Sequence, residues 1–355
     1  MGLPSIIIKF KTTGISAIKR GSRGIVALII KDANLTEPLM LTEATGIPES
    51  LSQGNKEYIK RAFMGGMSAP KKVIVYGLDD DATVYTEALN YFATCKFDYL
   101  AGAPDITNEL ATTVATWVKS QRDNFGKKIK AVLPNVAADH EGIINFTTSD
   151  IKVGENTYTA AQYCSRIAGI LAGTPLNMAA TFTVLNEVED VPRLDKTQAD
   201  AKIDAGELIL YHDGEKVKIG RAVNSLTTET PEKGEAFKKI KLVDIMDLTY
   251  EDIKTTANDN YIGKISNTYD NKCLLITAIK GYFEQLENEG LYERGISTVE
   301  INIEKQRTYL RNIGVDVDSM SEYEIKSANT GSKVFLHTKA KPIDAMEDIE
   351  YDIEI

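Results

Sequence analysis

The stretch that decides the fold is residues 72–133, which contain three short apolar runs, KVIVYG (72–77), FDYLA (97–101) and KIKAVL (128–133). The runs have the length and composition of buried strands. Two segments with helical spacing of apolar residues lie between them, near Thr83–Thr94 and Asp105–Asp123. Strands and helices that alternate in this way predict an α/β unit, a sheet covered by helices.

Neighbouring segments extend this unit on both sides. The further predicted elements are a strand at Gly24–Ile30, helices near Glu49–Met64 and Tyr158–Leu171, and a hairpin that joins Glu207–His212 to Lys216–Gly220. The hairpin is indicated by Asp213-Gly214, since Asp-Gly suits the positive φ angles of a type I′ turn. Residues 24–220 are therefore predicted to form one mixed α/β body.

The composition changes at residues 224–234, which are rich in Thr, Pro and Glu. This stretch predicts a linker or an exposed loop, and we place a domain boundary after residue 230. Elements predicted beyond it are helices near Leu242–Ala257, Asn271–Asn288 and Glu304–Asn312, and strands near Val299–Ile303 and Lys333–Thr338. They predict a second domain of the α+β class.

The two ends of the chain carry opposite charge. Residues 1–31 contain six basic residues and no acid, whereas residues 342–355 contain six acids and no base. The last seven residues, Ile349–Ile355, alternate apolar and acidic side chains without exception. This period of two predicts a strand with one buried face.

A similar pattern occurs near the start of the chain. Ile6, Ile8 and Phe10 fall on one face of an extended segment, and Lys9 and Lys11 fall on the other. Opposite charges on adjacent strands favour pairing by up to about 1 kcal/mol per pair. The ends are therefore predicted to be strands that pair by charge.

Two arrangements of these strands are open at this point. They pair inside one molecule, with each other or with the second domain, or each is donated to the sheet of a neighbouring molecule through main-chain hydrogen bonds. Donation requires a connection that is long and flexible enough to reach the neighbouring molecule. We expect residues 11–23 to provide it, because Gly14, Gly21 and Ser22 make this stretch flexible.

Composition and motifs argue against several classes of function. The net charge of −10 argues against general nucleic-acid binding, and no apolar run approaches the roughly 20 residues that span a bilayer. The phosphate-loop, dinucleotide, nucleophile-elbow and His-Glu-x-x-His motifs are absent from the sequence. We therefore expect no enzymatic activity and no cofactor.

Three local features of the sequence are candidates for sites of chemistry. In the loop Gly77–Asp81, three acids would repel a phosphate, and we expect them to be solvated and to cap the next helix. His140 and His212 each lie beside acids, but neither has a second histidine nearby. Since a metal site needs three or four ligands, both are predicted to be exposed loop residues, and no catalytic or metal-binding residue is assigned.

Four stretches follow one another in a distinctive order along the chain: AIKRGSRG (17–24), TPEKGEAFKKI (230–240), YIGKISN (261–267) and PIDAMEDI (342–349). Together they resemble the contractile tail sheath proteins of phages, of PBSX-type prophages and of phage-tail-like bacteriocins. None of the stretches is a catalytic signature. The similarity lies in their order and spacing over the full length.

The resemblance implies a structural subunit that polymerises around an inner tail tube and contracts to drive the tube through a target cell envelope. Its partners would be further copies in six-fold rings or helical strands, the inner tube protein, and baseplate and terminator proteins, with no nucleic acid and no membrane insertion. It would assemble in the bacterial cytoplasm and then belong to the tail of a released phage or phage-tail-like particle. No cofactor is implied.

The resemblance also implies a division into four parts. These are an N-terminal arm (1–23), an outer α/β body (24–230), an inner α+β domain (231–341) and a C-terminal arm (342–355). The expected fold class is therefore α/β plus α+β, with extended strand arms that join neighbouring inner domains. The residues expected at the arm interfaces are Ile6, Ile8, Lys9, Phe10, Lys11, Ile349, Glu350, Tyr351, Asp352, Ile353, Glu354 and Ile355.

A basic helix face is a further candidate. Lys305, Arg307 and Arg311 lie on one predicted helix, with the two arginines four residues apart on the same face. This is either a solvated face or, in a sheath, a contact with an acidic tube. Two other functions also stay open: a motif-less α/β enzyme or small-molecule-binding protein, and another phage component such as a baseplate or capsid subunit.

Overall fold

The computed structural model describes residues 17–355, so the predicted N-terminal strand with Ile6, Ile8 and Phe10 lies outside the described residues. The chain forms two compact units. The larger unit comprises residues 22–248 and 344–355. The smaller unit comprises residues 249–343 and the described residues before Ser22.

The units divide inside helix α6 (Ile240–Asn260), after Leu248, whereas the sequence suggested a boundary after residue 230. The Thr-, Pro- and Glu-rich stretch is only partly the exposed loop that its composition predicted. Asn224 and Ser225 are buried, and the Asn224 N–H donates to the carbonyl of Lys238 at 2.9 Å. The exposed part begins at Thr227.

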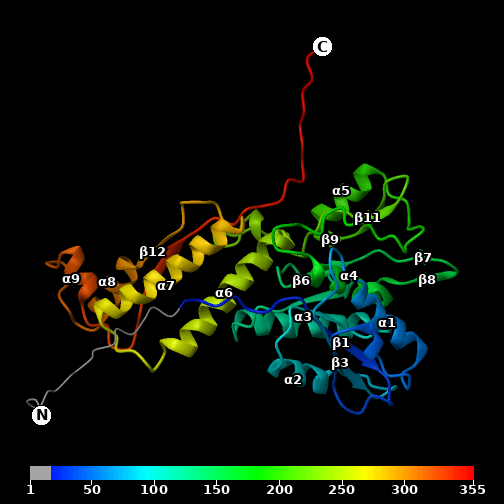
Figure 1. Ribbon diagram of the computed structural model, residues 1–355, viewed down its shortest axis with the longest axis horizontal. Helices are drawn as coiled ribbons and strands as arrows, with labels where there is room; N and C mark the ends of the chain where they lie inside the picture. Colours follow the sequence, from blue (N-terminus) through cyan, green and yellow to red (C-terminus); the bar gives the residue numbers. More distant parts are fainter. Residues whose placement is uncertain (1–16) are drawn as a thin grey trace, which may run out of the picture. The chain divides into compact units, whose positions relative to one another are not determined.

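The larger unit is built on a seven-stranded sheet with the order β2-β3-β1-β4-β5-β6-β9 (Figure 1). Its strands are β1 (Ile25–Lys31), β2 (Leu39–Leu41), β3 (Lys72–Leu78), β4 (Tyr99–Ala101), β5 (Lys130–Pro134), β6 (Ile143–Phe146) and β9 (Glu207–Leu208). Neighbours are parallel except for β2 and β3. The four strands predicted from apolar runs are confirmed, and their burial on both faces explains why the runs are continuous.

Helices cover both faces of this sheet. They are α1 (Gln53–Met64) and α4 (Ala160–Gly173) on one face, and α2 (Thr86–Thr94) and α3 (Asn108–Asp123) on the other. Val26 and Leu28 of β1 pack with the first pair of helices, while Ala27 and Ile29 pack with the second. All four helices were predicted, and the structure confirms them.

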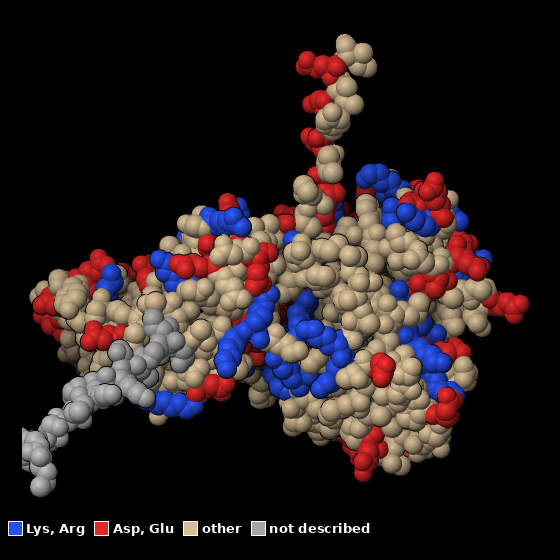
Figure 2. Space-filling view, viewed as in Figure 1, with Lys and Arg blue, Asp and Glu red and all other residues tan. Residues whose placement is uncertain are grey.

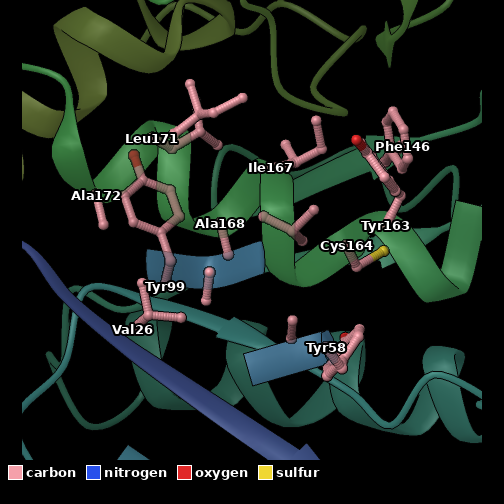
Figure 3. Packing of buried hydrophobic residues seen from close by; sticks show 14 of the residues in the cluster. Val26, Tyr58, Tyr99, Phe146, Tyr163, Cys164, Ile167, Ala168, Leu171 and Ala172 are labelled. Atoms are coloured by element: carbon pink, nitrogen blue, oxygen red, sulfur yellow. The ribbon is translucent and has the colours of Figure 1, made fainter. Parts of the chain in front are cut away.

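The pair α1 and α4 is packed closely. Figure 3 shows Ile167, Ala168 and Leu171 of α4 above Val26 of β1. A Cβ atom at Gly169 would lie 2.0 Å from the carbonyl oxygen of Ala62 in α1. Only glycine permits this helix contact without displacing the backbone.

Smaller elements complete the larger unit. They are the 3-10 turns η1 (Ala44–Gly46) and η2 (Glu235–Lys238), helix α5 (Lys196–Asp204), the pair β7 (Ile151–Val153) and β8 (Asn156–Tyr158), and the pair β10 (Leu210–His212) and β11 (Val217–Ile219). The predicted hairpin is confirmed as β10–β11. Its turn has four residues, with a positive φ at Gly214 but not at Asp213, so it is not the type I′ turn expected.

The smaller unit packs the second half of α6 with α7 (Tyr269–Asn288), α8 (Ile303–Asn312), α9 (Glu322–Ser327) and the pair β12 (Thr298–Ile301) and β13 (Leu336–Lys339). The predicted helices and strands are confirmed, and α9 was not predicted. Tyr282 of α7 donates to Asp252 of α6 at 2.6 Å. Within residues 17–355, no helix combines the length and apolar character that crossing a membrane requires.

Candidate assembly interface

The last seven residues, Ile349–Ile355, are extended and unpaired with any strand of the described chain. Ile349, Tyr351 and Ile353 are 82 %, 80 % and 69 % exposed. Figure 2 shows acidic and uncharged residues alternating along this segment. Large apolar side chains in a row gain stability only when another surface covers them. The alternating pattern is therefore present, but these residues do not pair as a strand within the described chain.

The sheet β12–β13 in the smaller unit has two strands, and both outer edges are open among the described residues. The Asn302 N–H donates to the carbonyl of Phe335 at 2.9 Å, which fixes the alternation of the antiparallel ladder. In this register, the main-chain groups of Leu336 and Thr338 point away from β12. They are free to pair with an added strand.

An apolar groove of about 810 Å³ borders β13. Its walls come from the end of α6 and the loop after it, from the start of α7, and from residues 331–336. Leu336 and Val334 line it together with Ile262, which is 66 % exposed. A strand added beside β13 would place one face of its side chains over this groove.

The charges around the two strands differ in sign. Lys339 lies on β13, is exposed and has no ion pair among the described residues, whereas Lys341, two residues later, pairs with Glu293 at 2.9 Å. On the other strand, Glu300 is exposed. The edge of β13 thus complements an acidic strand, and the edge of β12 complements a basic one.

The described residues near the N-terminus are held in place, contrary to the flexible linker expected for residues 11–23. Arg20 pairs with Glu289 at 3.2 Å, and the Gly21 N–H donates to Asp252 at 2.8 Å. Arg23 pairs with Asp244 of α6. The prediction was wrong for residues 17–23 because their partners lie more than 200 positions away in the sequence.

Lys305, Arg307 and Arg311 lie on α8, as predicted, but the arginines have local partners. Arg307 pairs with Glu304 at 3.2 Å, and Arg311 pairs with Asp318 at 2.9 Å. Both pairs are largely exposed, so each contributes little to stability and can exchange for a partner's acid. The face is less basic than its sequence suggested, because, of its three cations, only Lys305 has no ion pair with the described part of the chain.

A buried network of charges, which sequence reasoning missed, fixes the first half of α6 to the sheet. Lys130 of β5 contacts Asp244 at 2.9 Å and Asp247 at 2.5 Å. Arg122 of α3 binds both oxygens of Asp247, at 2.9 and 2.8 Å, and the Tyr99 hydroxyl donates to Asp244 at 2.7 Å. The sequence contains a weak signal for this network, since Asp244 and Asp247 lie one turn apart and interrupt the apolar face of α6.

The pKa directions in this network follow from its pairing. Burial by itself would raise the pKa of Asp247, but Lys130 and Arg122 outweigh it and hold the pKa below the ordinary value of 3.8. The pKa of Arg122 is raised, since Asp247 and Glu141 outweigh the burial that would lower it. Asp247 is therefore a carboxylate at neutral pH.

His140 lies in a cluster with Asp123 and Glu141 whose ligand atoms are within 4.8 Å of one another. It is 6 % exposed, so the prediction of an exposed loop residue was wrong. Its Nδ1 accepts the Gly142 N–H at 2.9 Å, which leaves the ring proton on Nε2, 3.3 Å from Asp123. A protonated Nε2 has no lone pair for a metal ion, and the contacts fit a neutral, hydrogen-bonded histidine.

His212 was also predicted to be an exposed loop residue, and this was wrong. It ends β10, is half-buried, and its Nδ1 accepts the Gly214 N–H at 2.9 Å. Gly77 and Leu78 still belong to β3, while Asp79–Asp81 are exposed, as predicted, but do not cap α2, because Tyr85 occupies the N-cap. Near the carboxyl ends of the parallel strands, a cavity of about 340 Å³ contains Lys31, which is already paired with Asp105 at 2.9 Å.

Comparison with known proteins places the chain in a family. Residues 81–225 match the family model of the phage tail sheath protein central domain, and residues 232–355 match that of the phage tail sheath C-terminal domain. The chain is 43 % identical to the tail sheath protein of Clostridium phage phiCD119, over 100 % of this chain and 99 % of that protein. It is 27 % identical to the phage-like element PBSX protein XkdK of Bacillus subtilis, over 81 % of this chain and 60 % of that protein.

Solved structures share the fold. The helical sheath of the anti-feeding prophage in its contracted state superposes with a TM-score of 0.73 at 15 % identity, covering 100 % of this chain and 99 % of that chain. A sheath tail protein from Desulfitobacterium hafniense superposes with a TM-score of 0.71 at 20 % identity, covering 84 % and 94 %. The two domain matches and the full-length identity to a tail sheath protein show that this chain belongs to the phage tail sheath protein family.

Proposed function

We propose that the chain is the subunit of a contractile tail sheath, which polymerises around an inner tube and contracts to drive that tube through a target cell envelope. The observation that carries this proposal is an exposed alternating strand on the same chain as an open sheet edge beside an apolar groove. Each feature supplies what the other lacks. A second copy of the chain is the partner that fits both.

The acidic arm of one copy is assigned to β13 of its neighbour. There its main-chain groups would pair with those of Leu336 and Thr338, and its apolar face would cover the groove. Its acids would lie near Lys339 and Lys341. The basic N-terminal arm, with Lys9 and Lys11, is assigned to the opposite edge at β12, where Glu300 is exposed.

Contraction in such a polymer is a change between two sets of subunit contacts. The sheath assembles in the less favourable set and moves to the more favourable one when released, so no bound cofactor has to supply energy. Further partners are the inner tube protein, the baseplate and the tail terminator. The chain assembles with them in the bacterial cytoplasm and is carried in the tail of the released particle.

The decisive test is electron microscopy of the purified chain beside a variant that blocks the open edge. Thr338→Pro removes an outward N–H of β13 without removing a bond to β12. We expect the unaltered chain to form rings or tubes and Thr338→Pro to remain monomeric. The melting temperature of Thr338→Pro should lie within about 2 °C of that of the unaltered chain. His337→Ala, on the same strand, is the matched control and should form tubes.

If Thr338→Pro formed tubes at the same yield as His337→Ala, the assignment of the C-terminal arm to the edge of β13 would be contradicted. A stable monomer from the unaltered chain that binds a small molecule would support an enzyme or binding protein instead. Rings that never extend into tubes would support a baseplate or other phage component.

The basic face of α8 gives a separate prediction about the tube. If Lys305, Arg307 and Arg311 face an acidic tube, Arg307→Glu with Arg311→Glu should weaken assembly on tubes about tenfold, since each exposed contact contributes on the order of 1 kcal/mol or less. The measurement is the fraction of sheath that co-sediments with purified tubes at increasing salt. Unchanged co-sedimentation would show that this face is merely solvated.

A further inference from the structure

The C-terminal segment does not leave the body at residue 342, where the arm was expected to begin. Residues 344–355 belong to the larger unit, and three acids before the free strand contact it. The three acids are Asp344, Glu347 and Asp348, and their partners are Lys239, Arg221 and Thr181. We call these six residues the clamp.

Glu347 is the centre of the clamp. Its side chain is 8 % exposed, although it lies two residues before Ile349, which is 82 % exposed. Its Oε1 accepts the hydroxyl of Thr181 at 2.5 Å, and its Oε2 lies 3.6 Å from Arg221 Nε and 3.9 Å from Lys239 Nζ. Oε2 accepts no hydrogen bond, so the buried carboxylate is compensated by the Thr181 hydroxyl at Oε1 and by the charges of the two nearby cations.

The partners are themselves fixed by the fold. The Thr181 hydroxyl accepts the Ala222 N–H at 3.0 Å while it donates to Glu347. Lys239 forms a main-chain bridge with Val223, two residues after Arg221 in the chain. Segments 181–183, 219–223 and 238–240 therefore present one preformed surface to the three acids.

The clamp ends abruptly. Arg221 contacts Asp348 at 2.5 Å, whereas residues 349–355 are all exposed and form no hydrogen bond or ion pair with the described chain. Seven extended residues span about 23 Å, at about 3.3 Å per residue. An arm free from Pro342 would have fourteen residues and reach about 46 Å.

We propose that the clamp fixes the exit point of the donated strand and limits its reach to the last seven residues, so that only one neighbouring subunit lies within range. This inference rests on the proposed strand donation. The clamp residues position the strand and do not touch the neighbour's sheet. A loosened clamp would allow the same strand to reach wrong neighbours and pair out of register.

The clamp is testable on the full chain before any assembly takes place. A glutamate-specific protease cleaves after Glu347 and after Glu350, so the exposed Glu350 is an internal reference in the same segment. In size-selected monomer, we expect cleavage after Glu350 to be at least about tenfold faster than cleavage after Glu347. Arg221→Ala with Lys239→Ala should bring the two rates within about twofold, and Lys238→Ala should leave the ratio unchanged.

A charge exchange tests whether the specific pair matters. Arg221→Asp should loosen the clamp, and adding Asp348→Arg should recover most of the cleavage ratio. In electron micrographs, the loosened variants should give short or irregular assemblies, and the exchanged pair should restore regular tubes.

Equal cleavage at both sites in the unaltered chain would overturn the clamp. Regular tubes at full yield from a variant with a loosened clamp would overturn its positioning role. If deletion of Tyr351–Ile355 left tubes intact, strand donation would fail while the cleavage ratio could still hold. The two proposals therefore fail separately.

Discussion

Deletion of Tyr351–Ile355 is expected to abolish sheath assembly while leaving a folded chain of unchanged thermal stability. The deleted residues are exposed and form no hydrogen bond or ion pair with the described chain, so the folded monomer loses little that stabilises it. The assembly loses the buried side chains of Tyr351, Ile353 and Ile355, together with the main-chain bonds to the neighbour. Replacement of Ile349, Tyr351, Ile353 and Ile355 by Ser should have the same effect without shortening the chain.

The expected effect on assembly is large. Each apolar side chain that is fully buried contributes about 1.5–3 kcal/mol, so three of them contribute on the order of 5 kcal/mol per joint. A loss of this size weakens each joint by more than about a thousandfold. The measurements are sedimentation of polymer against concentration and the melting temperature of the monomer.

The matched control for these variants is Met346→Ser. Met346 is 94 % exposed and apolar, but it lies inside the clamped segment and outside the alternating strand. It should assemble as the unaltered chain does. Normal tubes from the deletion would refute strand donation, whereas a fall in the monomer's melting temperature would show that the segment also supports its own body.

Much of the fold was predictable, because local patterns determine its main elements. The apolar runs of β1, β3 and β5 and the amphipathic periods of α3, α4 and α7 are each visible within a dozen or so residues. The short strands β2 and β6 were missed, since three or four residues carry too weak a pattern, and the predicted strand Glu207–His212 is divided into β9 and β10. The compact units divide inside α6, where a continuous helix shows no change of composition, whereas the predicted boundary after residue 230 falls between the two family-model matches.

The site was predictable in part. The alternation of Ile349–Ile355 and the opposite charges of the ends are properties of consecutive residues. The clamp and the buried network are not, since Arg221 and Asp348 are 127 positions apart and Arg122 and Asp247 are 125 apart. His140 appeared to be an ordinary loop histidine for the same reason: its burial depends on chain segments that only the fold brings together.

The buried network leads to the largest expected effect on stability. Asp247→Ala would leave Arg122 and Lys130 buried without their shared carboxylate. Removing one partner of a buried ion pair costs about 3–5 kcal/mol, a large part of the roughly 5–15 kcal/mol that stabilises a domain. We expect the melting temperature of the larger unit to fall by roughly 10 °C, measured by calorimetry.

The same residue predicts a dependence on pH. Because the folded pKa of Asp247 lies below its ordinary value of 3.8, its contribution is fully present above that value and is lost as the pH falls through the folded pKa. The difference in stability between the unaltered chain and Asp247→Ala should therefore be constant near neutral pH and shrink below about pH 4. Urea unfolding at a series of pH values measures it.

Asp204→Ala removes an exposed acid from the same unit and is the matched control. We expect it to change the free energy of unfolding by no more than about 0.5 kcal/mol. A second variant separates charge from packing: Asp247→Asn keeps the shape and some hydrogen bonds but not the charge, and should fall between Asp247→Ala and the unaltered chain. If Asp247→Ala has the same melting temperature as the control, Arg122 and Lys130 must form ion pairs with other groups when Asp247 is absent. The anchoring of α6 would then rest on Asp244, with Tyr99, and on the apolar face of the helix.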